Sequence, residues 1–92
     1  MRKKDRPNTQ TYWESGMFHV KLYNTNIVAW NSDHIVLTPG NINTDTTRRR
    51  MNQTAVDYNL DFRVSNKKHC FTAEYRGKTY VGDHENAILL IR

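Results

Sequence analysis

The chain has few of the residues that build disulfides and phosphate-binding loops. Its 92 residues include one cysteine, Cys70, and four glycines. A single thiol excludes a disulfide within the chain and is typical of a reducing cytoplasm. Four separated glycines leave no glycine-rich loop of the kind that cradles a phosphate group. These shortages argue against a cross-linked scaffold and against a phosphate-binding enzyme.

Long apolar runs and catalytic groupings are missing as well. The longest apolar stretches, Ile27–Trp30 and Ala87–Ile91, are far too short to cross a bilayer. Residues 1–10 form a basic segment, but the apolar stretch of a secretory signal does not follow it. The four histidines are scattered, and no Cys/His pair has the spacing of zinc ligands. We therefore expect a soluble intracellular protein that is not an enzyme, with no membrane contact, metal, cofactor or catalytic residues.

Positive charge is what the chain has in excess. The net charge is +5 at pH 7, and residues 47–92 carry nine Lys/Arg against five Asp/Glu. A concentrated positive field attracts anionic partners and speeds encounter with them. The alternative is that the basic residues only keep a small protein soluble.

Alternating apolar and polar residues predict short strands that pair as antiparallel hairpins. Turn residues separate the apolar runs on both sides of a predicted helix. Residues 86–92 fit either a last strand or a short helix. The other predicted strands are Met17–Tyr23, Ile27–Trp30 and His34–Leu37 before the helix, and Phe62–Val64, His69–Tyr75 and Lys78–Val81 after it.

A single helix is predicted between the two groups of strands. Thr44 or Asp45 can cap its first free N–H groups. An apolar stripe recurs at i, i+4 and i+7, at Met51, Ala55 and Tyr58. Asn59 tolerates the left-handed conformation and is expected to end the helix.

These elements predict an α+β fold, in which one helix packs on a small antiparallel sheet. The order is three strands, one helix and three to four strands. We expect residues 15–92 to form a single domain. Residues 1–14 contain Pro7 and show no hydrophobic period, so they are predicted to be a mobile basic arm. Such an arm either adds salt-dependent attraction to nucleic acid or has no role.

Three consecutive arginines, Arg48, Arg49 and Arg50, lie in the first turns of the predicted helix. Positive charge there opposes the helix dipole and costs about 0.3–1 kcal/mol per exposed residue. Helix stability alone therefore does not explain the run. Arginine forms bidentate bonds with phosphate and carboxylate groups. Successive residues point about 100° apart, and Arg49 should point furthest outward. The run is either a partner contact or a solvated face with ion pairs to Asp57 or Asp61.

Further basic residues lie in the predicted hairpin turns after the helix. If one of these turns lies near the helix start, a continuous basic ridge results. Stacking of single-stranded nucleic acid would need exposed aromatic side chains among the basic residues. Tyr23, Tyr75 and Tyr80 could serve, whereas Phe18 and Trp30 are assigned to the core. The predicted partner- or phosphate-binding residues are Arg48, Arg49, Arg50, Gln53, Lys67, Lys68, Arg76 and Lys78.

The segment from Ile35 to Val64 resembles small uncharacterised bacteriophage proteins. The likeness is carried by the run Thr-Thr-Arg-Arg-Arg-Met-Asn-Gln at residues 46–53 and by the hairpin that follows, with its Glu-Tyr-Arg-Gly-Lys-Thr-Tyr at residues 74–80. The family pattern has a glycine pair and a tryptophan before the helix, where this chain has a single glycine and no tryptophan. The resemblance implies a phage origin and no catalytic activity.

Small phage proteins without an active site commonly bind and block host machinery. The first hypothesis is therefore an inhibitor of a host defence or nucleic-acid-handling complex, of the anti-CRISPR kind, acting in the host bacterial cytoplasm. The second is a sequence-independent nucleic-acid-binding protein, and the third is a phage structural or assembly accessory. The partner would be a host protein or ribonucleoprotein complex, and nucleic acid in the second case. A homodimer through the strand at Ala87–Ile91 is a further possibility.

Overall fold

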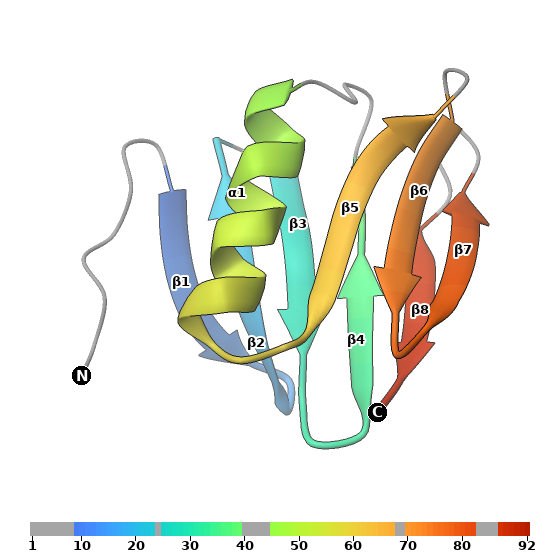
Figure 1. Ribbon diagram of the computed structural model, residues 1–92. Helices are drawn as coiled ribbons and strands as arrows, with labels where there is room; N and C mark the ends of the chain where they lie inside the picture. The colour runs from blue at the N-terminus through green and yellow to red at the C-terminus, as the bar shows by residue number, and fades with distance from the viewer. Residues whose placement is uncertain (1–8, 24, 40–44, 68–69, 83–86) are drawn as a thin grey trace.

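A computed structural model describes residues 9–23, 25–39, 45–67, 70–82 and 87–92. Its strands form two antiparallel sheets (Figure 1). Sheet A has the order β1-β2-β3-β4-β8, and sheet B has the order β5-β6-β7. The bounds are β1 (Thr9–Glu14), β2 (Met17–Leu22), β3 (Thr25–Trp30), β4 (His34–Leu37), α1 (Asp45–Asp57), β5 (Phe62–Lys67), β6 (Cys70–Tyr75), β7 (Lys78–Gly82) and β8 (Ile88–Ile91).

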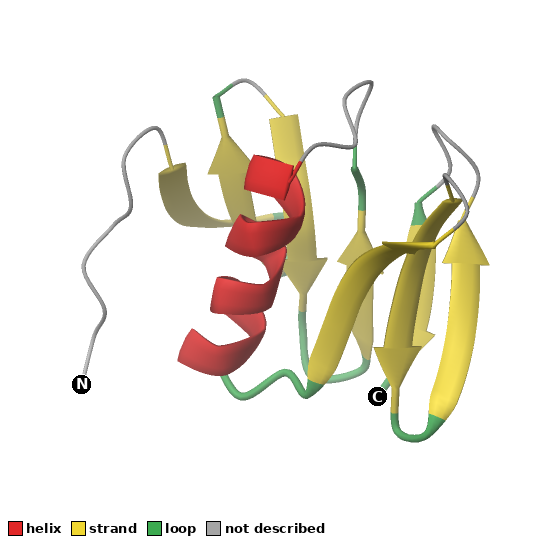
Figure 2. Ribbon diagram, turned by 45° about the horizontal axis from the view of Figure 1, so that its top comes forward, coloured by secondary structure: helices red, strands yellow, loops and turns green. Residues whose placement is uncertain are grey.

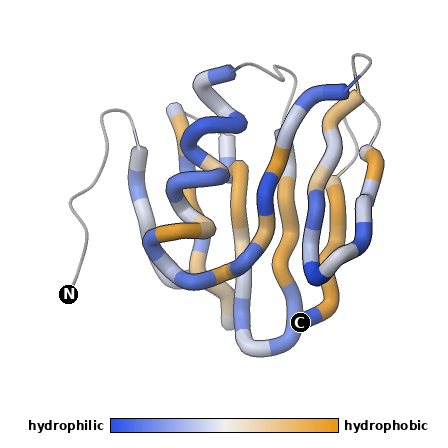
Figure 3. Tube along the Cα trace, viewed as in Figure 1, coloured by the Kyte–Doolittle hydropathy of each residue, from blue (hydrophilic) through white to orange (hydrophobic). Residues whose placement is uncertain are grey.

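The predicted fold class is confirmed, with two sheets in place of the predicted one. The helix α1 and sheet B lie side by side over the same face of sheet A (Figures 1 and 2). The apolar segments, orange in Figure 3, follow the strands that meet between these two layers. The core residues are Val20, Leu22, Ile27, Val28, Trp30, Ile35, Leu37, Met51, Ala55, Leu60, Phe62, Val64, Phe71, Ala73, Tyr75, Ile88 and Leu90.

The predicted basic arm is wrong for residues 9–14, which form β1 and pair with β2 along their full length. Ser15 and Gly16 join the two strands, with φ of 54° and 80°. Positive φ at both central residues matches the twist of a tight hairpin. The remainder of the predicted arm, residues 1–8, lies outside the described residues.

The ambiguous segment near residue 90 is a strand. β8 pairs with β4 in antiparallel register, with Ile35 opposite Leu90 and Leu37 opposite Ile88. These four side chains are buried. β5 also runs on to Lys67, so residues 65–67, predicted to be a turn, belong to a strand.

The helix faces the core through Met51 and Ala55, as its apolar stripe predicted, whereas Tyr58, the third residue of that stripe, follows the helix and is 39% exposed. Thr47, Met51, Thr54 and Ala55 are buried, and Val56 on the outward side is 77% exposed. The buried Thr54 Oγ1 donates a hydrogen bond to Arg50 O at 2.9 Å, which satisfies its hydroxyl. Within the described chain no helix is long and apolar enough to cross a membrane.

Asn59 ends the helix as predicted, with φ of 55°. Leu60 N donates to Ala55 O at 2.9 Å, the six-residue bond of a Schellman motif in which Asn59 takes the left-handed position. Leu60 and Ala55 are both buried, which supplies the apolar contact that accompanies this motif. Asp45 is the first residue of α1, and the other capping candidate, Thr44, lies outside the described residues.

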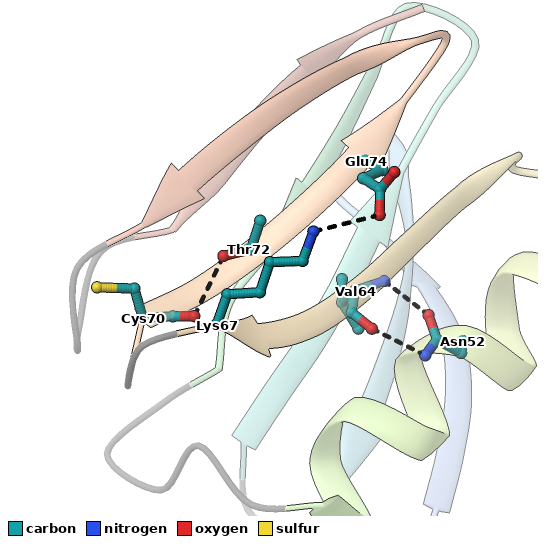
Figure 4. Close-up of polar contacts among 6 residues, drawn as sticks. All are labelled: Asn52, Val64, Lys67, Cys70, Thr72 and Glu74. Carbon is teal, nitrogen blue, oxygen red and sulfur yellow. Dashed lines mark hydrogen bonds and ion pairs between the residues drawn. The ribbon is translucent and has the colours of Figure 1, made fainter.

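A side-chain bridge joins α1 to the edge of sheet B. Asn52 Nδ2 donates to Val64 O at 3.1 Å, and Val64 N donates to Asn52 Oδ1 at 2.8 Å (Figure 4). The primary amide thus makes the same pair of hydrogen bonds that a neighbouring strand would make. It occupies an outer edge position of β5.

Candidate binding surfaces

The three arginines of α1 do not act as one group. Arg48 forms an ion pair with Asp45 at 2.5 Å, and its side chain is only 15% exposed. Arg50 Nη1 donates to Gln53 Oε1 at 2.9 Å, and Arg50 is half-buried. Arg49 is exposed, as the helix geometry predicted. Of the three guanidinium groups, that of Arg49 is therefore best placed to meet a partner.

The other predicted basic residues divide between two ends of the molecule. Lys67, at the end of β5, lies at the same end as the start of α1, whereas the turn at residues 76–77 lies at the opposite end of sheet B (Figure 1). Lys67 Nζ is 4.0 Å from Glu74 Oε1, and both side chains are more than half exposed. Arg76 and Lys78 therefore do not join the arginines in one ridge, and Lys68 lies outside the described residues.

The turn at Arg76 has a local role of its own. Arg76 and Gly77 have φ of 50° and 78°, which gives a two-residue hairpin turn between β6 and β7. The guanidinium of Arg76 lies 5.2 Å from the centre of the Tyr75 ring. Tyr75 itself is 3% exposed, so its predicted use as a stacking platform is wrong. Its side chain faces inward with Ala73 and Phe71, two and four residues away along β6.

A cluster of aromatic side chains crosses the first three strands of sheet A. Trp13 lies opposite Phe18, and Phe18 lies opposite Trp30. The ring centres are 4.8 Å apart in the first pair, which meets edge to face, and 5.5 Å apart in the second, which is stacked. Tyr58, just beyond α1, lies 5.0 Å from Trp30. We call these four residues the aromatic cluster.

Much of the aromatic cluster is open to solvent. Trp13 is 59% exposed, Phe18 41% and Tyr58 39%, while Trp30 is buried at 6%. The assignment of Phe18 to the closed core is therefore wrong. Its strand faces the core, but the ring sits at the end of β2 beside the exposed Trp13, where it is incompletely covered.

A pocket of about 410 Å³ opens beside this cluster. Arg92 stands at its edge, where Nη1 donates to Asn31 O at 2.8 Å. Asn31 Oδ1 in turn accepts from the main-chain N–H groups of Asp33 and His34, at 2.8 Å each. The guanidinium of Arg92 is thus hydrogen-bonded to a turn that the side chain of Asn31 closes. The lining residues are Trp13, Gly16, Phe18, Trp30, Asn31, Ser32 and Arg92.

Sequence reasoning missed this pocket because its residues come from four separate segments. The available signal was Ser15–Gly16, a two-residue turn that puts Trp13 opposite Phe18. Trp13 falls within the arm predicted for residues 1–14, and no pattern in the sequence points to a role for Arg92.

No group of three or more His, Cys, Asp or Glu side chains comes together in the part of the chain that the structure describes. Comparison of the chain with protein-family models, with curated proteins and with solved structures finds no match. The resemblance to phage proteins therefore stays a prediction.

Proposed function

We propose that this chain is a non-catalytic binding protein that docks on another protein through its aromatic cluster. The observation that carries the proposal is the exposure of Trp13 and Phe18 beside the guanidinium of Arg92, which is hydrogen-bonded to Asn31 O. Residues that dominate binding energy at protein interfaces are enriched in Trp, Tyr and Arg. A pocket of this size accepts one or two large side chains of a partner, and Arg92 suits a carboxylate next to them.

The charges near the pocket favour a protein over a nucleic acid. Asp33 lies in the same turn as the lining residues Asn31 and Ser32, and it is exposed. Among the lining residues that the structure describes, Arg92 alone carries a positive charge. Nucleic-acid sites instead combine stacking with a continuous positive groove.

The target class follows from the sequence hypothesis. We propose that the partner belongs to a host defence or nucleic-acid-handling complex and that docking blocks it, in the manner of an anti-CRISPR protein. Arg49 and Lys67, exposed at the other end of the molecule, would then add a weaker electrostatic contact with an acidic surface or with phosphate. Direct nucleic-acid binding through these same basic residues is the alternative function.

Affinity capture from bacterial lysate, with and without nuclease, separates the two functions. The variants are Trp13→Ala and Phe18→Ala, and the control is Tyr23→Asn, which removes an aromatic ring that is 66% exposed at the opposite end of β2. Asparagine suits the control because Tyr23 has φ of 55°.

We expect a defined set of proteins that survives nuclease and is retained by the control. The same proteins should be lost from both pocket variants. If all captured material disappears with nuclease, or if the pocket variants capture the same proteins as the unmodified chain, the proposed function is wrong.

A further inference from the structure

The outer edge of β8 differs from the other sheet edges. β8 is the last strand of sheet A and is hydrogen-bonded to β4 on one side only. At the edge of sheet B, Asn52 occupies main-chain groups of β5. The other outer strands carry charge, Glu14 in β1 and Lys78 in β7. Charge and side-chain cover are common ways of preventing edge-to-edge pairing. β8, with the sequence Ile-Leu-Leu-Ile, carries no charge, and among the described residues no side chain bonds to its outer edge.

The register of β8 shows which of its main-chain groups point outward. Arg92 N donates to Asp33 O at 2.9 Å, so residues 33 and 92 form a hydrogen-bonded pair. Hydrogen-bonded and non-hydrogen-bonded pairs alternate along antiparallel strands. The pairs formed by Leu89 with Val36 and by Ile91 with His34 are therefore non-hydrogen-bonded. The N–H and C=O groups of Leu89 and Ile91 point away from β4, towards the outer edge.

The side chains of these same two residues are also exposed. Leu89 is 53% and Ile91 60% exposed, on the face of sheet A that neither α1 nor sheet B covers (Figures 1 and 2). Leu89 continues an apolar row across this face, since it lies opposite Val36, which lies opposite Ala29. Apolar side chains and outward-pointing main-chain groups thus coincide at one edge.

We infer that a second copy of this chain pairs with this edge, β8 against β8 in antiparallel orientation. A two-fold axis perpendicular to the sheet keeps the apolar faces on the same side, so each exposed residue must lie opposite an exposed residue of the partner. The pairing centred on Leu90 places Leu89 opposite the partner's Ile91, and Ile91 opposite the partner's Leu89. These are the residues whose main-chain groups point outward, so this register also forms the hydrogen-bonded pairs.

A second copy fits this edge better than an unrelated strand. The four residues carry no charge, so two copies meet without repulsion. The two-fold axis sets Leu89 of each copy opposite Ile91 of the other, which makes the edge self-complementary. β8 contributes only four residues, so the interface is small and the association is weak and concentration-dependent. The inference does not depend on the proposed function, because it uses none of the pocket residues' side chains.

Sedimentation equilibrium over a wide concentration range tests the pairing. The mass should rise from that of one chain, 10.9 kDa, towards twice that value as concentration increases. Leu89→Lys/Ile91→Lys should stay monomeric, since each lysine would face a lysine. The control Val56→Lys adds a charge at an exposed apolar position of α1 and should still dimerise. A monomeric native chain at every concentration would overturn the inference.

Charge exchange tests the register. In Leu89→Lys/Ile91→Glu each lysine faces a glutamate of the partner, so dimerisation should return. A register centred on Leu89 would set lysine against lysine, and a monomeric double variant would therefore overturn the proposed pairing. Mixing Leu89→Lys/Ile91→Lys with Leu89→Glu/Ile91→Glu should restore association between two chains that are monomeric alone. An unfolded variant cannot give that result, and a mixture that stays monomeric contradicts the inference.

Discussion

Replacing Asn52 with alanine should destabilise the protein through the loss of one bridge. The side chain makes two hydrogen bonds with Val64, each worth a net ~1 kcal/mol, so about 2 kcal/mol is lost. Alanine is the better helix former by about 0.5 kcal/mol, which offsets part of the loss. The expected net change in the free energy of unfolding is about 1.5 kcal/mol, or roughly 6–12 °C in Tm for a domain of this size.

Urea unfolding followed by circular dichroism measures this change. The midpoint should fall while the slope of the free energy against urea concentration stays constant. Gln53→Ala is the matched control, because it removes a neighbouring amide that accepts a single bond from Arg50, and it should change stability by no more than about 0.5 kcal/mol. Asn52→Asp keeps the shape but replaces the donor with a second acceptor facing Val64 O, so it should destabilise at least as much as alanine.

Equal changes for Asn52→Ala and Gln53→Ala would refute the reasoning. The bridge would then contribute nothing beyond an ordinary surface amide. An Asn52→Asp variant as stable as the native chain would refute it separately, because shape alone would then account for the contact.

Three further predictions concern other parts of the chain. Asn59→Ala should destabilise by about 1 kcal/mol, since alanine resists the left-handed conformation, whereas Asn59→Gly should be neutral or stabilising; thermal unfolding of the pair decides. Phe18→Ala should change the emission of Trp13 and Trp30, the only tryptophans in the chain, without unfolding it; unchanged fluorescence would contradict the pocket geometry. Arg49→Ala should alter stability by less than about 0.5 kcal/mol, and a larger loss in urea unfolding would show that this side chain has a structural role.

The sequence was most informative where neighbouring residues decide the structure. The helix stripe at Met51 and Ala55, its end at Asn59 and the outward direction of Arg49 all follow from the 3.6-residue period and from local backbone preference. Such features depend on residues within a few positions of one another. They were therefore predicted correctly from the order of residues alone.

The parts that failed depend on pairing between distant segments. β1 has a largely polar pattern, and it becomes a strand because β2 lies beside it. β8 joins β4 and not its sequence neighbour β7, which gives sheet A five strands and sheet B three. One local contact also went unpredicted: Arg48 forms an ion pair with Asp45, three residues before it. The pocket needed both the hairpin register and the position of Arg92.

The pairing of β4 with β8 has a consequence for how the chain folds. Each of the other strand pairs joins consecutive strands, whereas β4 and β8 are separated in the sequence by α1 and all of sheet B. Closing so long a segment costs more chain entropy than closing a hairpin, and non-local pairing slows folding. Ile35 and Leu37 therefore have their β3 neighbours early but lack their β8 neighbours, Leu90 and Ile88, until β8 docks. The hairpins can form early, while the docking of β8 completes sheet A and makes the two layers one cooperative unit.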